Sequence, residues 1–289
     1  MQPLVRNTLG AACLAACSLG AQAITLVGLT SANQITRIDT TNIAAATVTP
    51  ITGLVAGDRF VGIDLRPKNN KIYGVTLSSK LYTVDELTGA TTFVAALSSP
   101  VIDASLGYGI DFNPVADFGA GASLRLVSSS GSNFAVNAST GVVGNAASNI
   151  GTGFTGVSYS NSNPLPLVAP ASTALYYINS NTDMLMVANS GFNAPTITAV
   201  GALGVDALKA NGFEVLGNGM AYAALNIDAG SSLVSSLYSI NLATGAATLQ
   251  GNYNGTLSGL TVSAVPEPQT AALMLAGLLA VGSLLRRQR

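Results

Sequence analysis

The stretch of sequence that decides the fold runs from Phe60 to Leu97 and reads FVGIDLRPKNNKIYGVTLSSKLYTVDELTGATTFVAAL. Aromatic and β-branched residues are concentrated in four short segments, which cover residues 60–65, 72–77, 80–85 and 91–97. Such residues favour strands, whereas the Pro, Asn, Asp and Gly residues between the segments favour turns. The stretch therefore predicts four antiparallel strands in succession.

The same pattern recurs along the chain with a nearly constant period. A glycine, an apolar residue and a polar residue follow one another at Gly62-Ile63-Asp64, Gly109-Ile110-Asp111, Gly156-Val157-Ser158, Gly212-Phe213-Glu214 and Gly259-Leu260-Thr261. These glycines are 47, 47, 56 and 47 residues apart. Four antiparallel strands in each period of roughly 40 to 50 residues are typical of a β-propeller blade. The sequence thus predicts an all-β protein, a five-bladed β-propeller.

The two ends of the repeat region predict how the ring of blades closes. Only one strand, at 257–262, follows the last glycine copy, and three strands, at 24–30, 34–39 and 47–51, precede the first. We expect these N- and C-terminal strands to form one shared blade, because closure removes unpaired strand edges. A two-sheet sandwich or a β-solenoid is the alternative, since both also use short strands. The Ser-, Gly- and Asn-rich stretches 130–156 and 161–170 predict loops.

Residues 1–23 have the pattern of an export signal peptide. Arg6 precedes an apolar stretch, and Ala21 and Ala23 then occupy the −3 and −1 positions of a leader-peptidase site, so the mature chain is expected to begin at Ile24. Leu14–Cys17 also matches a lipobox, which leaves lipidation of Cys17 as the alternative. Cleavage after Ala23 would remove both cysteines, so we expect no disulfide in the mature protein.

Residues 265–289 contain three sorting features in order. Pro266, Glu267 and Pro268 come first, and an uncharged, mostly apolar segment, Thr270 to Leu285, follows them. Three arginines near the end of the chain come last: Arg286, Arg287 and Arg289. The apolar segment would span about 24 Å as a transmembrane helix in a bilayer that adapts to it, and the arginines would keep the chain end cytoplasmic.

This chain end resembles the PEP-CTERM sorting signal of Gram-negative bacteria. The resemblance implies cleavage near Pro266–Pro268 by an exosortase, a protease embedded in the membrane. It also implies a precursor anchored in the inner membrane and then release or attachment at the cell surface, often in bacteria that make exopolysaccharide. A plain C-terminal membrane anchor is the alternative.

Composition excludes several classes of chemistry. The chain has no His, which rules out Ser-His-Asp and Cys-His relays as well as His-ligated metal sites. With 12 basic and 13 acidic residues, a formal net charge of −1 and no basic cluster, it offers no electrostatic surface for nucleic acid. We therefore expect no nucleic-acid partner.

The polar residue of each repeat is the candidate site. First strands line the channel of a propeller, so Asp64, Asp111, Ser158, Glu214 and Thr261 would form a ring containing three carboxylates. Such oxygens suit Ca²⁺, which is the one cofactor considered, and a pair of the carboxylates could act as general acid and base on a glycan. Alternatively, these residues cap strand ends or hydrogen-bond neighbouring blades.

The middle of the chain also resembles a family of secreted bacterial proteins known only as a domain of unknown function. The residues that carry this likeness are Asp58–Pro67, Leu81–Asp85 and Thr88–Ala90. The likeness covers most of residues 24–262. It implies a repeat β fold and an exported location, but no activity. We expect a surface or extracellular-matrix protein, more readily non-enzymatic, that binds polysaccharide or other envelope components. The alternative is a secreted lyase or glycosidase that uses the channel carboxylates.

Overall fold

The computed structural model describes residues 23–99, 102–121, 123–145, 148–228 and 233–264. Ala21, the sorting motif Pro266–Pro268, the apolar segment after it and the three C-terminal arginines all lie outside these residues. Within the described part of the chain, no helix has both the length and the apolar character needed to span a membrane.

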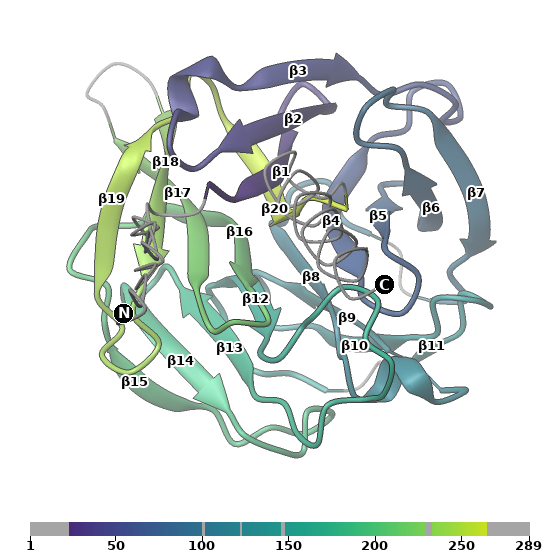
Figure 1. Ribbon diagram of the computed structural model, residues 1–289. Coiled ribbons are helices and arrows are strands. Elements are labelled where there is room, and N and C mark those ends of the chain that lie inside the picture. Colours follow the sequence, from purple (N-terminus) through teal and green to yellow (C-terminus); the bar gives the residue numbers. More distant parts are fainter. Residues whose placement is uncertain (1–22, 100–101, 122, 146–147, 229–232, 265–289) are drawn as a thin grey trace, which may run out of the picture.

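Five four-stranded antiparallel sheets surround a common centre (Figure 1). The blade that the sequence shows most clearly comprises β4 (Phe60–Arg66), β5 (Lys71–Thr76), β6 (Lys80–Val84) and β7 (Thr91–Ala96). The next comprises β8 (Tyr108–Phe112), β9 (Leu124–Ser128), β10 (Asn133–Val136) and β11 (Val143–Gly144). Short 3₁₀ turns lie at η1 (Ile43–Ala45) and η2 (Ala116–Phe118).

Two further blades follow in the same order, from the centre outward. One comprises β12 (Phe154–Tyr159), β13 (Leu175–Asn179), β14 (Met184–Ala188) and β15 (Thr198–Ala202). The other comprises β16 (Lys209–Val215), β17 (Ala221–Asp228), β18 (Leu233–Ile240) and β19 (Ala247–Asn252). The predicted all-β, five-bladed architecture is confirmed, and the sandwich and solenoid alternatives are wrong because the sheets form separate blades around a centre.

The fifth blade is built from both ends of the chain, as predicted. Its strands are β20 (Leu257–Val262), β1 (Thr25–Thr30), β2 (Gln34–Asp39) and β3 (Thr47–Pro50), in that spatial order. Strand β1 pairs with β20 from Leu26↔Val262 to Thr30↔Leu257. This pairing joins residues more than 220 positions apart in the sequence. It stabilises the closed ring because the edges of β1 and β20 that face each other would otherwise have unpaired backbone groups.

One loop prediction was wrong in part. The stretch 161–170 contains no strand, but 130–156 contains β10, β11 and the start of β12. Phe134 and Val136 are buried, and so is the polar Asn133 beside them, so burial of this strand outweighs the polar composition around it. The apolar core as a whole lies between neighbouring blades; Val27 and Leu29 of β1, for example, pack with Ile63 of β4.

Candidate functional site

The five polar residues of the repeat come together at the centre of the ring. Asp64, Asp111, Ser158, Glu214 and Thr261 lie on the innermost strands β4, β8, β12, β16 and β20, one from each blade. One carboxylate oxygen from each of the three acids lies within 4.8 Å of the others. All three acids are at least 97% buried. We call this set the channel ring.

Each member of the channel ring also connects its blade to the next. Asp64 Oδ2 accepts the Phe112 N–H at 2.7 Å, and Asp111 Oδ1 accepts the Tyr159 N–H at 2.9 Å. In both pairs the donor follows the polar residue of the neighbouring blade. The carboxylates therefore hydrogen-bond neighbouring blades, which is the structural role that the sequence left open.

The other three members repeat this arrangement and complete the circle. Ser158 Oγ accepts the Val215 N–H at 2.8 Å, and Thr261 Oγ1 accepts the Leu65 N–H at 2.9 Å. The Val262 N–H donates to the Glu214 carboxylate. The circle of inter-blade hydrogen bonds is thus continuous through all five blades.

The two hydroxyls also donate to carboxylates beside them. Ser158 Oγ donates to Asp111 Oδ2 at 3.0 Å, and Thr261 Oγ1 donates to Asp64 Oδ1 at 2.9 Å. Each hydroxyl therefore accepts one hydrogen bond from a backbone amide of the neighbouring blade and donates another to an acid. Glu214 differs, because its Oε2 is buried and has no hydrogen-bond partner.

Burial dominates the electrostatics of the channel ring. It raises the pKa of Asp64 to about 7, although hydrogen bonds from Phe112 and Thr261 oppose the shift. Burial, together with the neighbouring carboxylates, raises the pKa of Asp111 and of Glu214 well above the ordinary values of Asp and Glu. Three acids at this separation therefore favour one of two states: at least one of them binds a proton, or a cation offsets the charge of the ionised carboxylates.

The repeating glycines explain why the ring is so tight. A Cβ on Gly109 would lie 2.5 Å from the carbonyl oxygen of Thr155 in the next blade, and one on Gly212 would lie 2.4 Å from the Leu260 nitrogen. Gly212 also has a φ of +132°. The inner strands can approach this closely only where no side chain intervenes, so the ring is closed to a polymeric substrate. That geometry gives no support to catalysis by these carboxylates on a glycan.

A second feature lies on one face of the propeller, where the inner strands β16 and β20 end. A cavity of about 670 Å³ opens there, bordered by the first described residues of the chain and by the last ones before the tail. We call it the closure pocket. Its described lining residues include hydroxyl and amide side chains, namely Thr25, Thr40, Thr41, Ser162, Asn163, Asn218, Gln250 and Ser263.

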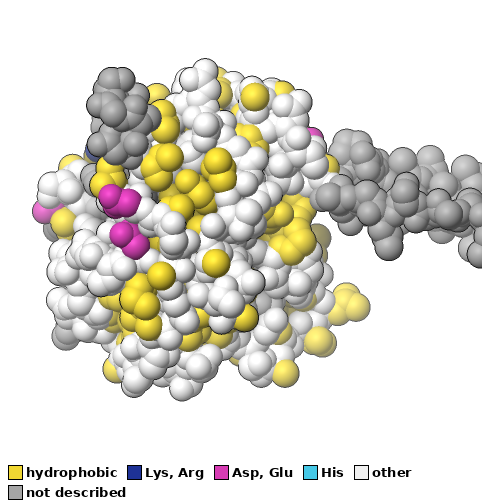
Figure 2. All heavy atoms as spheres, turned by 90° about the vertical axis from the view of Figure 1, so that its left-hand side faces the viewer, with side chains coloured by type: hydrophobic (Ala, Val, Ile, Leu, Met, Phe, Trp, Pro, Cys, Tyr) yellow, Lys and Arg dark blue, Asp and Glu magenta, His cyan; other side chains and the backbone are white. Residues whose placement is uncertain are grey.

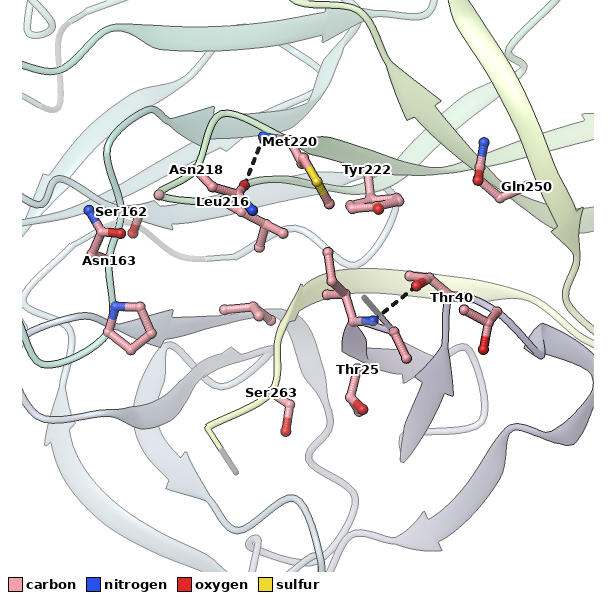
Figure 3. Close-up of a pocket in the computed structure, with 16 residues that line it drawn as sticks. Thr25, Thr40, Ser162, Asn163, Leu216, Asn218, Met220, Tyr222, Gln250 and Ser263 are labelled. Carbon is pink, nitrogen blue, oxygen red and sulfur yellow. Dashed lines mark hydrogen bonds between the residues drawn. The ribbon is translucent and has the colours of Figure 1, made fainter. Parts of the chain in front are cut away.

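Figure 3 shows how the walls of the closure pocket are arranged. Leu216, Asn218 and Met220, in the turn between β16 and β17, lie on one side with Tyr222, the second residue of β17. Thr25, Thr40 and Ser263 lie on the other side. None of the described lining residues carries a charge. The pocket is therefore a neutral cavity with hydrogen-bonding groups and an apolar wall.

The sequence did not reveal the closure pocket. Its residues come from the two chain ends and from turns of different blades, and no motif connects them. The one sequence signal was the predicted shared blade, in which the strand 24–30 pairs with the strand 257–262. Which side chains surround that junction depends on turn conformation: a parallel bridge between Ser162 and Leu216 brings a loop from the preceding blade to the pocket.

Hydrogen bonds fix the residues near both limits of the described part of the chain, Ile24 at one limit and Ser263 and Ala264 at the other. Ile24 N–H donates to Thr40 Oγ1 at 3.1 Å, and the Thr40 N–H donates to the Ile24 carbonyl at 3.0 Å. At the other end, Glu86 accepts hydrogen bonds from Ala264 N–H and Ser263 Oγ, both at 2.7 Å. The predicted cleavage points lie just outside these anchored residues.

The fold and its closed centre define the chain as a five-bladed β-propeller. It belongs to the DUF4394 family, described as a domain of unknown function, whose family model matches residues 34–261. The expected membership of a family of unknown function is thereby confirmed. Among curated proteins, no sequence match was found.

Solved structures of low sequence identity share parts of this fold. Regucalcin from Agrobacterium tumefaciens, a calcium-binding protein, matches with 13% identity and a TM-score of 0.41 over 80% of this chain and 67% of its own. A Bacteroides thetaiotaomicron protein of unknown function matches with 12% identity and a TM-score of 0.47 over 80% of this chain and 59% of its own. This chain thus spans 67% and 59% of their lengths, respectively.

Proposed function

We propose that this protein is an exported, non-enzymatic component of the cell surface or extracellular matrix, and that it binds polysaccharide in the closure pocket. The observation that carries the proposal is the pocket itself, a cavity of about 670 Å³ lined by uncharged hydrogen-bonding groups. Small-molecule sites typically occupy about 300 to 1,000 Å³. A segment of two or three sugar units falls in this range.

The chemistry of the lining suits a sugar. Amide and hydroxyl side chains, such as Asn218 and Gln250, can both donate to and accept from sugar hydroxyls. Tyr222 and Leu216 offer apolar surface for the C–H face of a pyranose ring. Figure 2 shows few charged side chains on the side of the molecule that it displays, so charge repulsion there would oppose neither a neutral nor an acidic polysaccharide.

Export is supported by the way the ends are anchored. Cleavage after Ala23 or near Pro266 would leave every strand of the shared blade paired, because Ile24 and Ala264 are held by the propeller itself. Leader peptidase and an exosortase are therefore the proposed processing partners, acting on a precursor that the inner membrane holds by its tail. The processed chain would remain a complete ring.

Processing would also change the closure pocket. Ile24 lines the cavity, and cleavage after Ala23 turns its backbone nitrogen into a free amino terminus. An α-amino group has a pKa of about 8 and is mostly protonated at neutral pH. The mature pocket would then carry one positive charge among neutral groups, which favours polysaccharides containing acidic sugars.

Affinity electrophoresis of the secreted protein through gels containing the exopolysaccharide of its host tests the proposal. We expect the wild type to be retarded and Asn218→Ala to bind about two- to tenfold more weakly, the effect of one hydrogen bond. Asn254→Ala is the matched control, because Asn254 is exposed in the turn before β20 and does not line the pocket. Absence of retardation, or equal weakening by both variants, would refute binding at this pocket.

A further inference from the structure

We propose that the channel ring binds one divalent cation on the propeller axis, and that Ca²⁺ is the ion it suits best. The ligands are the carboxylates of Asp64, Asp111 and Glu214, which three different blades contribute. The role is structural, because the ion would hold the inner strands together at the point where all five blades meet. This inference is independent of the polysaccharide proposal.

The spacing of the three carboxylates matches a calcium ion. One oxygen of each lies within 4.8 Å of the other two. A point equidistant from three such atoms lies at most about 2.8 Å from each, so the Ca–O distance of about 2.3 to 2.6 Å needs at most a small side-chain shift. Mg²⁺ demands near-ideal octahedral geometry at about 2.0 to 2.1 Å and gives up its water reluctantly, so three fixed carboxylates suit Ca²⁺ better.

Glu214 supplies a separate observation that points to a ligand. Its Oε2 is buried and has no hydrogen-bond partner, whereas both carboxylate oxygens of Asp64 and of Asp111 accept hydrogen bonds. Its side chain is 97% buried and reaches the other two acids. A buried carboxylate oxygen without a partner costs free energy, and coordination of a cation removes that cost.

The charge of the ring requires compensation that the described part of the chain does not supply. The ion pairs among these residues join Arg37 to Glu86 and Arg66 to Asp117, and neither includes a carboxylate of the ring. The buried Arg125 directs its guanidinium to Tyr159, Asn133 and Asn193. With all three acids ionised and no ion pair to a basic side chain among these residues, the ring would carry a charge of −3, and a divalent cation would lower it to −1.

The ligands are also held in place before an ion arrives. Backbone amides of neighbouring blades fix Asp64 and Asp111, and Thr261 and Ser158 support them from the side. Binding therefore needs little reorganisation of side chains, which favours affinity. Each bonded carboxylate oxygen keeps a second lone pair for the metal.

Thermal unfolding of the full-length protein, first stripped with a chelator and then titrated with Ca²⁺ or Mg²⁺, tests the inference. We expect Ca²⁺ to raise the melting temperature saturably, with Mg²⁺ weaker, and elemental analysis of the calcium-loaded, desalted protein to give one Ca²⁺ per chain. Glu214→Gln keeps the shape of the side chain and removes its charge, so we expect a folded variant without the calcium response. Asp206→Asn, at an exposed acid outside the ring, is the control and should respond like the wild type.

Each other outcome overturns the inference. A wild type whose melting temperature does not change with Ca²⁺, and which retains none, would show that protons rather than a metal offset the ring charge. An equal calcium response in Glu214→Gln and the wild type would place the ion elsewhere. If Glu214→Gln does not fold, Asp111→Asn provides the same comparison, because it too removes one charge and keeps the shape.

Discussion

Thr261 is the position where the closing strand joins the channel ring to the first complete blade. Its hydroxyl accepts the buried Leu65 N–H at 2.9 Å and donates to Asp64 Oδ1 at 2.9 Å. Thr261→Val removes both hydrogen bonds and keeps the shape of the side chain. The variant thus tests whether the inter-blade hydrogen bonds, rather than apolar packing alone, stabilise closure.

The magnitude follows from what is left unpaired. A buried amide without a partner costs about 1 to 3 kcal/mol, and Asp64 also loses one of its donors, so we expect a loss of about 2 to 3 kcal/mol. For a domain of this size each kcal/mol corresponds to about 2 to 4 °C, which gives a melting temperature lower by about 4 to 12 °C. Circular dichroism during heating and urea titration measures both quantities.

Thr248→Val is the matched control for this experiment. Thr248 lies on the outer strand β19 and is exposed, so its replacement should change the free energy of unfolding by less than about 0.5 kcal/mol. If Thr261→Val unfolds within that same margin of the wild type, the circle of hydrogen bonds does not contribute to stability as described, and the reasoning fails.

Three further predictions concern the inner strands and the charges. Gly109→Ala should lower the free energy of unfolding, measured in urea, by about 1 to 3 kcal/mol, because its Cβ would meet the Thr155 carbonyl. Gly121→Ala, with open space around it, should be nearly neutral. Equal effects of the two substitutions would contradict the close approach of the blades. Asp117→Ala should cost about 3 to 5 kcal/mol, since Arg66, whose side chain is only 13% exposed, loses its buried ion-pair partner at 2.7 Å. A melting temperature equal to that of the wild type would exclude this. With chelator present, the free energy of unfolding should fall as pH rises from about 5 to about 7.5. The reason is that native Asp64, with its pKa raised to about 7, retains a proton that the unfolded chain has already released. Urea midpoints that rise with pH over this window would contradict the prediction.

The fold could be predicted from the sequence because its determinants are local and repeated. The Gly-apolar-polar triplets recur with the blades, and the predicted strand 80–85 and the observed β6, Lys80–Val84, differ by one residue. The shared blade followed from counting strands at the two ends. The stretch 130–156 was misjudged because its strands β10 and β11 are short and lie among polar residues, so their burial is visible only in three dimensions.

The candidate sites were likewise predictable only where their residues recur at the same position of each repeat. Asp64, Asp111 and Glu214 could be grouped from sequence because each occupies the same position in its repeat. Their raised pKa values could not, since those depend on how closely the inner strands approach one another. The closure pocket could not be predicted either, because Tyr222 and Ser263 line one cavity only once the ring is closed.

Methionine-methyl NMR of the secreted protein during titration with oligosaccharides from the host exopolysaccharide tests the binding claim most directly. Met220 lines the closure pocket, and Met184 and Met186 lie on β14 of another blade, outside its described lining. Binding in the pocket predicts a saturable shift of the Met220 signal while the other two remain fixed. A Met220 signal that stays unchanged at saturating ligand, or shifts only as much as those of Met184 and Met186, would contradict it.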